Sequence, residues 1–376
     1  PADPGDNQDR LGIPTTDQPA VVAVDMASPN LAKEMHVGHL RSTVIGDCVA
    51  RLLEFDGHDV HRINHVGDWG TQFGMLLAYL RRTQPEVLDD PSSLRIDDLE
   101  TFYVSAKRMY DDDPAFAEQS RKTVVELQSG EPAVGAVWRA FCDESLRHCH
   151  EVFDRLNVTV EDRGESYYRS MLADVVTAFE DRKLAVQSDG ATCVFLDGFT
   201  SREGEPLPMM IRKSDGGYNY DTTDLAAIRH RIETLHAKKL FYVVGVAQKQ
   251  HFDMLFTAAR KIGWAGDDVT LDHLGFGNML GADGRPFKTR TGGTIKLKDL
   301  IAEAVSRARN IVQQNVEAGG ARSDFDEATV GAIAEAVGIG AIKYFDLSHN
   351  LGSDYKFDWD TMLAMEGNTA PYMLYA

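Results

Sequence analysis

The sequence has few cysteines, no long apolar run and a shortage of basic residues. Its four cysteines, Cys48, Cys142, Cys149 and Cys193, form neither a CxxC pair nor a disulfide framework, so we expect free thiols in a reducing, cytoplasmic environment. Cys142 and Cys149 are seven residues apart and would share one helix face, which favours packing over metal binding. No uninterrupted apolar stretch approaches the ~18 residues of a membrane span, so we expect no membrane partner.

Basic residues are outnumbered by acidic ones. With 39 Lys and Arg against 58 Asp and Glu, the formal net charge is −19, which argues against tight non-specific binding of nucleic acid. One local stretch, 283–298, reverses this balance, since Asp283 is its single carboxylate. Its five cations are Arg285, Lys288, Arg290, Lys296 and Lys298. A polyanion could therefore still dock on a local basic surface.

The 376 residues are enough for two or three globular units, with 43% hydrophobic and 26% charged residues. No signal or transit segment is visible, and a chain that opens at Pro1 without Met is expected to be a fragment or a processed form. Shifts in composition divide the chain into a flexible lead-in, a first α/β half, an acidic inserted segment, a second α/β half and a helical segment. The predicted boundaries are 1–19, 20–83, 84–205, 206–296 and 297–376.

Strand and helix signals alternate in both predicted halves. A β-branched run at 21–25, a helix near 39–56 and a strand near 59–64 predict a βαβ unit, and hence a parallel sheet with a right-handed crossover. The second half is expected to resume near Met210, with a helix from Thr223. The other elements that the patterns predict are short strands within 184–198, a strand at 240–244 and helices at 298–316 and 327–345.

The turn between the first strand and its helix carries the sequence SPNLAKEMHVGH at 28–39. A turn that contains glycine lets a phosphate approach the helix N-terminus, where unpaired N–H groups favour anions. His36 and His39 can donate to phosphate oxygens, while Gly38 leaves room for a flat base or a ribose.

Tyr220 and Asp224 lie four residues apart at the start of a predicted helix, and hence on one face. A carboxylate beside a phenol could receive a cation with several donors, such as a guanidinium. Alternatively, Asp224 is a carboxylate of the helix N-terminus and Tyr220 a core aromatic. The residues alone leave both interpretations open.

Two glycine-rich segments follow in the second half. His273-Leu-Gly-Phe-Gly277 comes after a strand-like run and would let backbone approach a flat ligand, although a tight turn explains it equally well. Residues 283–293 form a cationic loop of the kind that neutralises pyrophosphate charge in a transition state.

Taken together, these segments resemble class I aminoacyl-tRNA synthetases, and the arginyl branch in particular. His36-Val-Gly-His39 resembles the family's HIGH signature, Tyr220-Asp-Thr-Thr-Asp-Leu-Ala226 its substrate segment, and 283–293 its KMSKS loop. The similarity extends over about residues 9–376. It implies an α/β fold with a Rossmann-like parallel sheet in two halves, an inserted α+β connective segment and a C-terminal helical segment.

The resemblance also implies roles for individual residues. The implied catalytic residues are His36, His39, Lys33, Lys288 and Arg290. The residues implied to bind ATP are Gly38, His39, His273, Gly275, Phe276 and Gly277. The residues implied to bind arginine are Asp25, Asn30, His36, Tyr220, Asp224 and Gln248. No metal ligand from the protein is implied.

The sequence departs from the family pattern at two places. The two signature lysines of the loop fall at Pro286 and Thr289, which moves the expected catalytic cation to Lys33, as in many arginyl enzymes. Leu351 stands where an arginine is usual. The absence of that arginine would weaken an RNA contact or a local ion pair.

The implied activity is ATP-dependent formation of arginyl-adenylate from L-arginine, followed by transfer to tRNA(Arg). Mg²⁺ would be carried by ATP, and the chain would act as a monomer in the cytoplasm. Two alternatives stay open: a paralogue that delivers arginine to a small amine, and a silent domain that senses ATP or arginine.

Overall fold

The computed structural model describes residues 10, 12–201, 203–285, 287, 295–317 and 325–375, which form two compact units. Unit 1 takes the chain up to Met26, then 45–64 and 160–276. Unit 2 takes 27–44, 65–159 and the chain from Gly277 onward. Helix α1 (Val37–Asp56) runs across this division, so each unit is assembled from segments far apart in the sequence.

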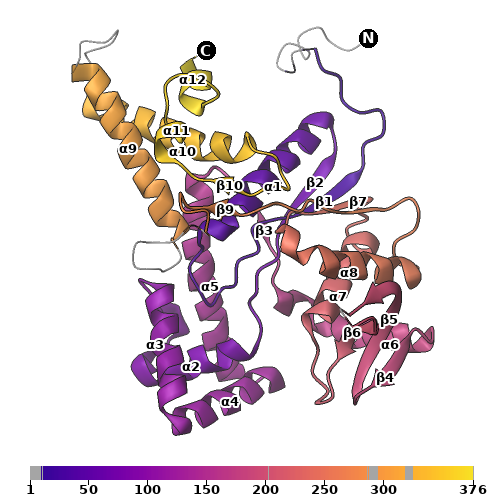
Figure 1. Cartoon of the computed structure of the whole chain (residues 1–376). Coiled ribbons are helices and arrows are strands. Elements are labelled where there is room, and N and C mark those ends of the chain that lie inside the picture. Colours follow the sequence, from indigo (N-terminus) through magenta and orange to yellow (C-terminus); the bar gives the residue numbers. More distant parts are fainter. Residues whose placement is uncertain are drawn as a thin grey trace. The chain divides into compact units, whose positions relative to one another are not determined.

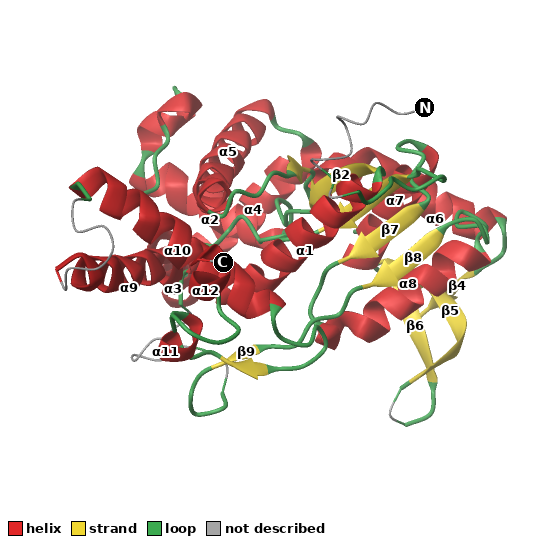
Figure 2. Cartoon of the chain, turned by 90° about the horizontal axis from the view of Figure 1, so that it is seen from above, coloured by secondary structure: helices red, strands yellow, loops and turns green. Residues whose placement is uncertain are grey.

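A five-stranded parallel sheet is the centre of unit 1, and Figure 2 shows two of its strands, β7 and β8, side by side. The strands are β1 (Val21–Asp25), β2 (Asp59–Asn64), β3 (Glu161–Asp162), β7 (Lys239–Tyr242) and β8 (Thr270–His273), in the order β3-β2-β1-β7-β8. β1 pairs in parallel with β2 on one side and β7 on the other. Such a central strand is buried on both faces, which explains its unbroken run of apolar residues. The predicted βαβ unit is confirmed.

The remaining elements of unit 1 include a second, antiparallel sheet in the order β4-β5-β6. They are η3 (Glu165–Met171), α6 (Leu172–Asp181), β4 (Ala185–Ser188), β5 (Ala191–Thr200), β6 (Pro206–Arg212), α7 (Tyr220–Glu233), η4 (Val246–Gln248) and α8 (Lys249–Lys261). Met210, expected to open the second parallel half, pairs instead with Cys193 of β5. Buried and less buried residues alternate along the end of β6, as in an antiparallel strand with one covered face. Both sheets share one core, to which α7 contributes Leu225 and Ile228.

Unit 2 is mainly helical. Its elements are α2 (Thr71–Thr83), η1 (Pro85–Leu88), η2 (Pro91–Ser93), α3 (Leu99–Asp112), α4 (Pro114–Ser129), α5 (Pro132–Arg155), β9 (Met279–Leu280), α9 (Leu297–Glu317), α10 (Glu327–Leu347), β10 (Tyr355–Lys356), α11 (Trp359–Met362) and α12 (Ala370–Tyr375). Edge-to-face contacts between Phe73 and Phe141 and between Tyr79 and Phe116 join α2 to α5 and α4. Cys142 and Cys149 form no disulfide and are both buried along α5, as expected for a packing role.

Helices α9 and α10 pack closely side by side, as Figure 1 shows. A Cβ at Gly338 of α10 would lie 2.8 Å from backbone atoms of Val305 in α9, so glycine permits this close approach. Among the described residues, α10 alone has the length and apolar composition to cross a membrane, by those two criteria only. In the structure α10 packs on α9 and α12, 28% of its apolar window is buried, and its Glu335 pairs with Arg155 at 2.9 Å.

The largest fully buried polar side chain of unit 2 is Arg41, two residues after His39 on α1. Its Nε donates to Oδ1 of Asp346 on α10 at 3.0 Å, and Nη1 donates to the carbonyls of Gly277 and Ser353 at 2.8 and 3.1 Å. The hydroxyl of Tyr355 donates to the same Asp346 oxygen at 2.8 Å. One guanidinium therefore ties the start of α1 to three segments more than 230 residues away along the chain.

Removing this cation should destabilise unit 2 strongly. Arg41→Met leaves the buried carboxylate of Asp346 with the Tyr355 hydroxyl but without its cation, and we expect the free energy of unfolding to fall by about 3–5 kcal/mol. The measurement is urea unfolding followed by circular dichroism. As the control, Arg108→Met removes a cation that is 84% exposed in its pair with Asp112, for which we expect a change below about 0.5 kcal/mol. Equal losses for the two variants would contradict this role of Arg41.

Candidate functional site

The strand order of unit 1 changes direction beside β1. On one side of β1 lie β2 and then β3, and on the other side lie β7 and then β8. The direction in which successive strands are added to the sheet therefore reverses between β1 and β7. Ligands of open parallel sheets bind outside the carboxyl ends of the strands at such a reversal. Asp25 ends β1 and His273 ends β8, so both lie at this edge.

Asp25 is engaged by the protein itself. Its Oδ2 accepts from Nη2 of Arg231 at 2.7 Å, and both side chains are buried. The guanidinium of Arg231 also lies 5.1 Å from the centre of the Tyr242 ring, and burial raises the pKa of the Tyr242 hydroxyl. Asp25, which the resemblance assigned to the substrate, thus holds a buried cation beneath the edge of the sheet.

Helix α7 brings Tyr220 and Asp224 together near the same edge. Asn219 is the N-cap, because its side chain accepts from the backbone N–H of Tyr220 at 2.9 Å. The helix therefore begins at Tyr220 rather than at Thr223, and Asp224 is left for other contacts. Tyr220 is 58% exposed. Tyr220 is therefore not a core aromatic, and Asp224 lies beyond the first turn of the helix, whose acidic residue is Asp221.

Asp224 is paired with a residue that the sequence reasoning did not select. Nε2 of His251, on α8, lies 2.7 Å from Oδ2 of Asp224, and Nδ1 lies 3.2 Å from Oδ1 of Asp221. The Tyr220 and His251 rings meet edge to face at 5.2 Å. Burial lowers the pKa of His251, but the hydrogen bonds to Asp221 and Asp224 outweigh it and raise that pKa to about 9. Gln248 ends η4, immediately before α8.

The segment 273–276 continues the edge of the sheet. Nε2 of His273 donates to the carbonyl of Val244 at 2.9 Å, and the ring stacks on Phe252 at 4.8 Å. Phe276 forms a parallel bridge with Gly245. A Cβ at Gly275 would lie 3.3 Å from the His273 ring and 3.5 Å from Val246, so a small side chain would fit there only if the His273 ring moved slightly.

Gly277, in unit 2, has a packing role. Its N–H donates to the carbonyl of Leu351 at 3.0 Å. A Cβ at Gly277 would lie 2.3 Å from the carbonyl carbon of Ser353, so no side chain fits there. The turn at 351–354 therefore requires this glycine, whatever binds nearby.

In unit 2 the two histidines of the HVGH segment adopt defined tautomers. The backbone N–H of His36 donates to Nδ1 of His39 at 3.0 Å, and that of Gly38 donates to Nδ1 of His36 at 3.0 Å. Because both Nδ1 atoms accept, the proton of each neutral ring lies on Nε2. Burial and the neighbouring His36 lower the pKa of His39 to about 3, and burial lowers that of His36. The start of α1 thus presents two neutral N–H donors.

Gly38 is required by the position of His36. A Cβ at this glycine would lie 2.7 Å from Cε1 of the His36 ring. Nearby, Asn30 is exposed and its Oδ1 accepts from the N–H of Ala32 at 2.9 Å. Lys33 is exposed, with Nζ 4.3 Å from the centre of the Tyr103 ring.

The end of the cationic loop is joined to this segment by strand-like pairing. The N–H of Val37 donates to the carbonyl of Ile295 at 3.0 Å, and that of Leu297 donates to Met35 at 2.9 Å. Because these bonds hold residues 295–297 beside residues 35–37, the loop begins and ends within unit 2. Lys288 and Arg290, with Pro286 and Thr289, lie outside the residues that the structure describes.

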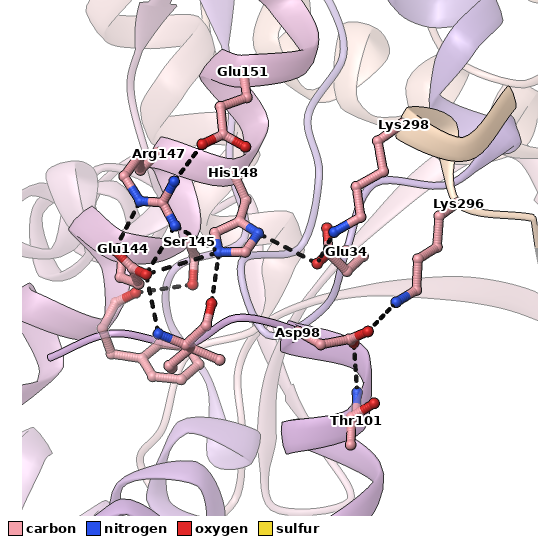
Figure 3. A network of polar contacts seen from close by, with 12 residues as sticks. Glu34, Asp98, Thr101, Glu144, Ser145, Arg147, His148, Glu151, Lys296 and Lys298 are labelled. Carbon is pink, nitrogen blue, oxygen red and sulfur yellow. Dashed lines mark hydrogen bonds and ion pairs between the residues drawn. The ribbon is translucent and has the colours of Figure 1, made fainter. Parts of the chain in front are cut away.

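Two of the five cations in 283–298 are neutralised locally. Lys298 lies 2.9 Å from Glu34, and Lys296 pairs with Asp98 (Figure 3). Glu34 is buried and also lies 3.3 Å from Nδ1 of His148. The expected basic surface is therefore smaller than the sequence suggested, since Lys296 and Lys298 pair with carboxylates.

The donors of unit 2 and the acidic residues of unit 1 suit different ligand groups. Among the described residues, no group of three His, Cys, Asp or Glu side chains could hold a metal ion. The neutral donors at α1 suit phosphate oxygens, and the acidic cluster of α7 suits a basic side chain.

Comparison with known proteins gives the family. Residues 6–359 match the model of class I tRNA synthetases (R), catalytic domain. The chain belongs to this family. It is 53% identical over 367 residues to an arginine–tRNA ligase of a Nostoc species and 50% identical over 368 residues to one of a Synechococcus species, each alignment covering 98% of this chain. The chain spans 62% and 63% of the length of these relatives.

A solved relative supports the fold. The crystal structure of arginyl-tRNA synthetase from Plasmodium falciparum superposes with a TM-score of 0.82 at 35% identity, covering 95% of this chain and 57% of that one. The expected α/β fold of a class I synthetase with a parallel sheet is therefore confirmed.

The raised pKa of His251 gives a stability prediction. A group whose pKa is higher in the folded than in the unfolded state stabilises the folded protein. This stabilisation is complete at pH values below the unfolded-state pKa and is lost as the pH rises through the folded-state pKa. For a change from 6.5 to about 9, the stability of wild type relative to His251→Gln should fall by on the order of 3 kcal/mol between pH 6.5 and 9. Urea unfolding of both proteins at several pH values measures it. Parallel pH profiles would contradict the charged state of His251.

Proposed function

We propose that the chain is the catalytic core of an arginine–tRNA ligase. In this reaction an oxygen of the arginine carboxylate bonds to the α-phosphorus of ATP, and the bond from that phosphorus to the bridging oxygen breaks, which releases pyrophosphate. The 2′-hydroxyl of the 3′-terminal ribose of tRNA(Arg) then attacks the carbonyl carbon of arginyl-adenylate, loses its proton and displaces AMP. The names of the relatives support this activity.

The observation that carries arginine as the substrate is the exposed Tyr220 beside the Asp224 carboxylate on α7. A guanidinium offers several N–H donors to a carboxylate and a phenol oxygen at once. In the proposal, Gln248 of the same unit contributes to the polar surroundings of the amino acid, while Asp25 acts by holding Arg231.

ATP is assigned to the donors at the start of α1. His36 and His39 are neutral, so their Nε2–H groups stabilise the charge that develops on the α-phosphate without a proton transfer. The attacking carboxylate is already ionised, so positioning and charge stabilisation dominate. The nucleotide's own Mg²⁺ would arrive with its phosphates, and Lys33 would supply the additional cation. The four free cysteines support a reducing, cytoplasmic location.

The role of His39 can be tested by adenylate formation. His39→Ala removes one positioned donor to a developing charge, and we expect arginine-dependent pyrophosphate exchange, with tRNA present, to fall by roughly 10²–10³-fold. The control is His236→Asn, at an exposed histidine with φ 57°, a conformation that asparagine tolerates. Exchange by His39→Ala within about threefold of the control would contradict the assignment.

Arginine specificity can be tested at Asp224. Loss of a carboxylate that pairs with a guanidinium costs on the order of 2–5 kcal/mol, so Asp224→Asn should raise the KM for arginine far more than the KM for ATP. Asp253→Asn is the matched control, because its carboxylate is 42% exposed and pairs with Lys249 on α8. If Asp224→Asn changed both KM values equally, Asp224 would have only a structural role.

A further inference from the structure

Within unit 1, His251 lies between two carboxylates of the neighbouring helix. The 2.7 Å contact to Asp224 and the 3.2 Å contact to Asp221 use both ring nitrogens. The exposed fractions of the side chains are 17% for His251, 25% for Asp224 and 11% for Asp221, so solvent screens their charges weakly. His251 is therefore part of the same cluster as the proposed arginine receptor, although its own side chain is not among the receptor groups.

The geometry favours the charged form of this histidine. A neutral imidazole has one N–H and can donate to one carboxylate only, whereas an imidazolium donates from both nitrogens. Asp221 and Asp224 are three residues apart on one helix and repel each other. A protonated His251 satisfies both carboxylates and removes one of their two negative charges.

We propose that His251 is a positioning residue for arginine recognition, because its imidazolium fixes the Asp224 carboxylate and leaves the acidic pair with one net negative charge. This inference rests on the proposed function of the chain. A receptor with one net negative charge matches the single positive charge of a guanidinium. Without the imidazolium, the two carboxylates repel and Asp224 is no longer held in one orientation, so arginine binding should weaken even though the local charge is more negative.

Among the described residues, the groups that face His251 come from α7 and from its own helix. From α7 they are Asp221, Asp224 and the ring of Tyr220, whose pKa is itself raised, first by Asp221. From its own helix, the Phe252 ring lies at 5.3 Å. Lys249 and Asp253, also on α8, pair with each other at 2.9 Å. The titration of His251 therefore depends on the two aspartates of α7.

The test compares wild type with His251→Gln, Asp221→Asn and the control Lys249→Gln in tRNA-dependent pyrophosphate exchange from pH 7 to 10. For His251→Gln at pH 7 we expect the arginine KM to rise by about 10–100-fold, as for loss of a charge-assisted hydrogen bond. The ATP KM and the kcat at saturating arginine should stay within about threefold. Lys249→Gln should leave the arginine KM within about twofold of wild type.

The pH profile separates this role from a structural one. In wild type the arginine KM should rise as His251 loses its proton, and this rise should be missing from His251→Gln. In Asp221→Asn it should occur at lower pH, because one carboxylate that favours the imidazolium is gone. The α-amino group of free arginine titrates equally in every assay, so each profile is read as its ratio to wild type.

The outcomes distinguish the inference from the function on which it rests. If wild type shows no arginine-dependent exchange, the proposed function fails. If wild type is active but His251→Gln keeps its arginine KM, changes both KM values equally or retains the wild-type pH profile, only the role of His251 is overturned. Circular dichroism at pH 7 checks the fold of each variant. Should His251→Gln not fold, the pH shift in Asp221→Asn decides, and its absence overturns the inference.

Discussion

The buried guanidinium of Arg41 is the constraint on which unit 2 depends most. Taking a charge out of water costs several kcal/mol, and this is offset only when the charge meets a counter-ion and further acceptors. Arg41 finds all of these, in Asp346, in two backbone carbonyls and in the ring of Tyr355 at 5.0 Å. Because its acceptors come from distant segments, the start of α1 can adopt its place only when the C-terminal part of the unit has formed.

This dependence extends to the two histidines. His39 lies half a turn before Arg41 on the same helix, and the pairing of residues 35–37 with 295–297 fixes the segment on its other side. The histidine tautomers then follow from backbone N–H groups, not from side-chain partners. The phosphate-binding chemistry proposed for this segment thus rests on a rigid frame rather than on the histidines' own preferences.

Unit 1 solves a similar problem in a different way. Two of its buried or partly buried acidic residues, Asp25 and Asp224, are each matched with a cation of the chain, Arg231 and His251. Arg231 is permanently charged, whereas the charge of His251 depends on its neighbours. Loss of a proton can therefore remove the cation of the second pair but not that of the first.

The sequence by itself determined the parallel βαβ unit at 21–64, the helical segment after 297 and the family resemblance carried by the segments around His36 and Tyr220. These are local signals, since hydrophobic periodicity and short motifs are read from neighbouring residues. It did not determine the pairing of Met210 with β5, the capture of Lys296 and Lys298 by carboxylates, or the contact of His251 with Asp224. In each of these contacts the two partners are between 17 and 264 residues apart along the chain. Only the tertiary structure decides which of many possible charged neighbours a buried group meets.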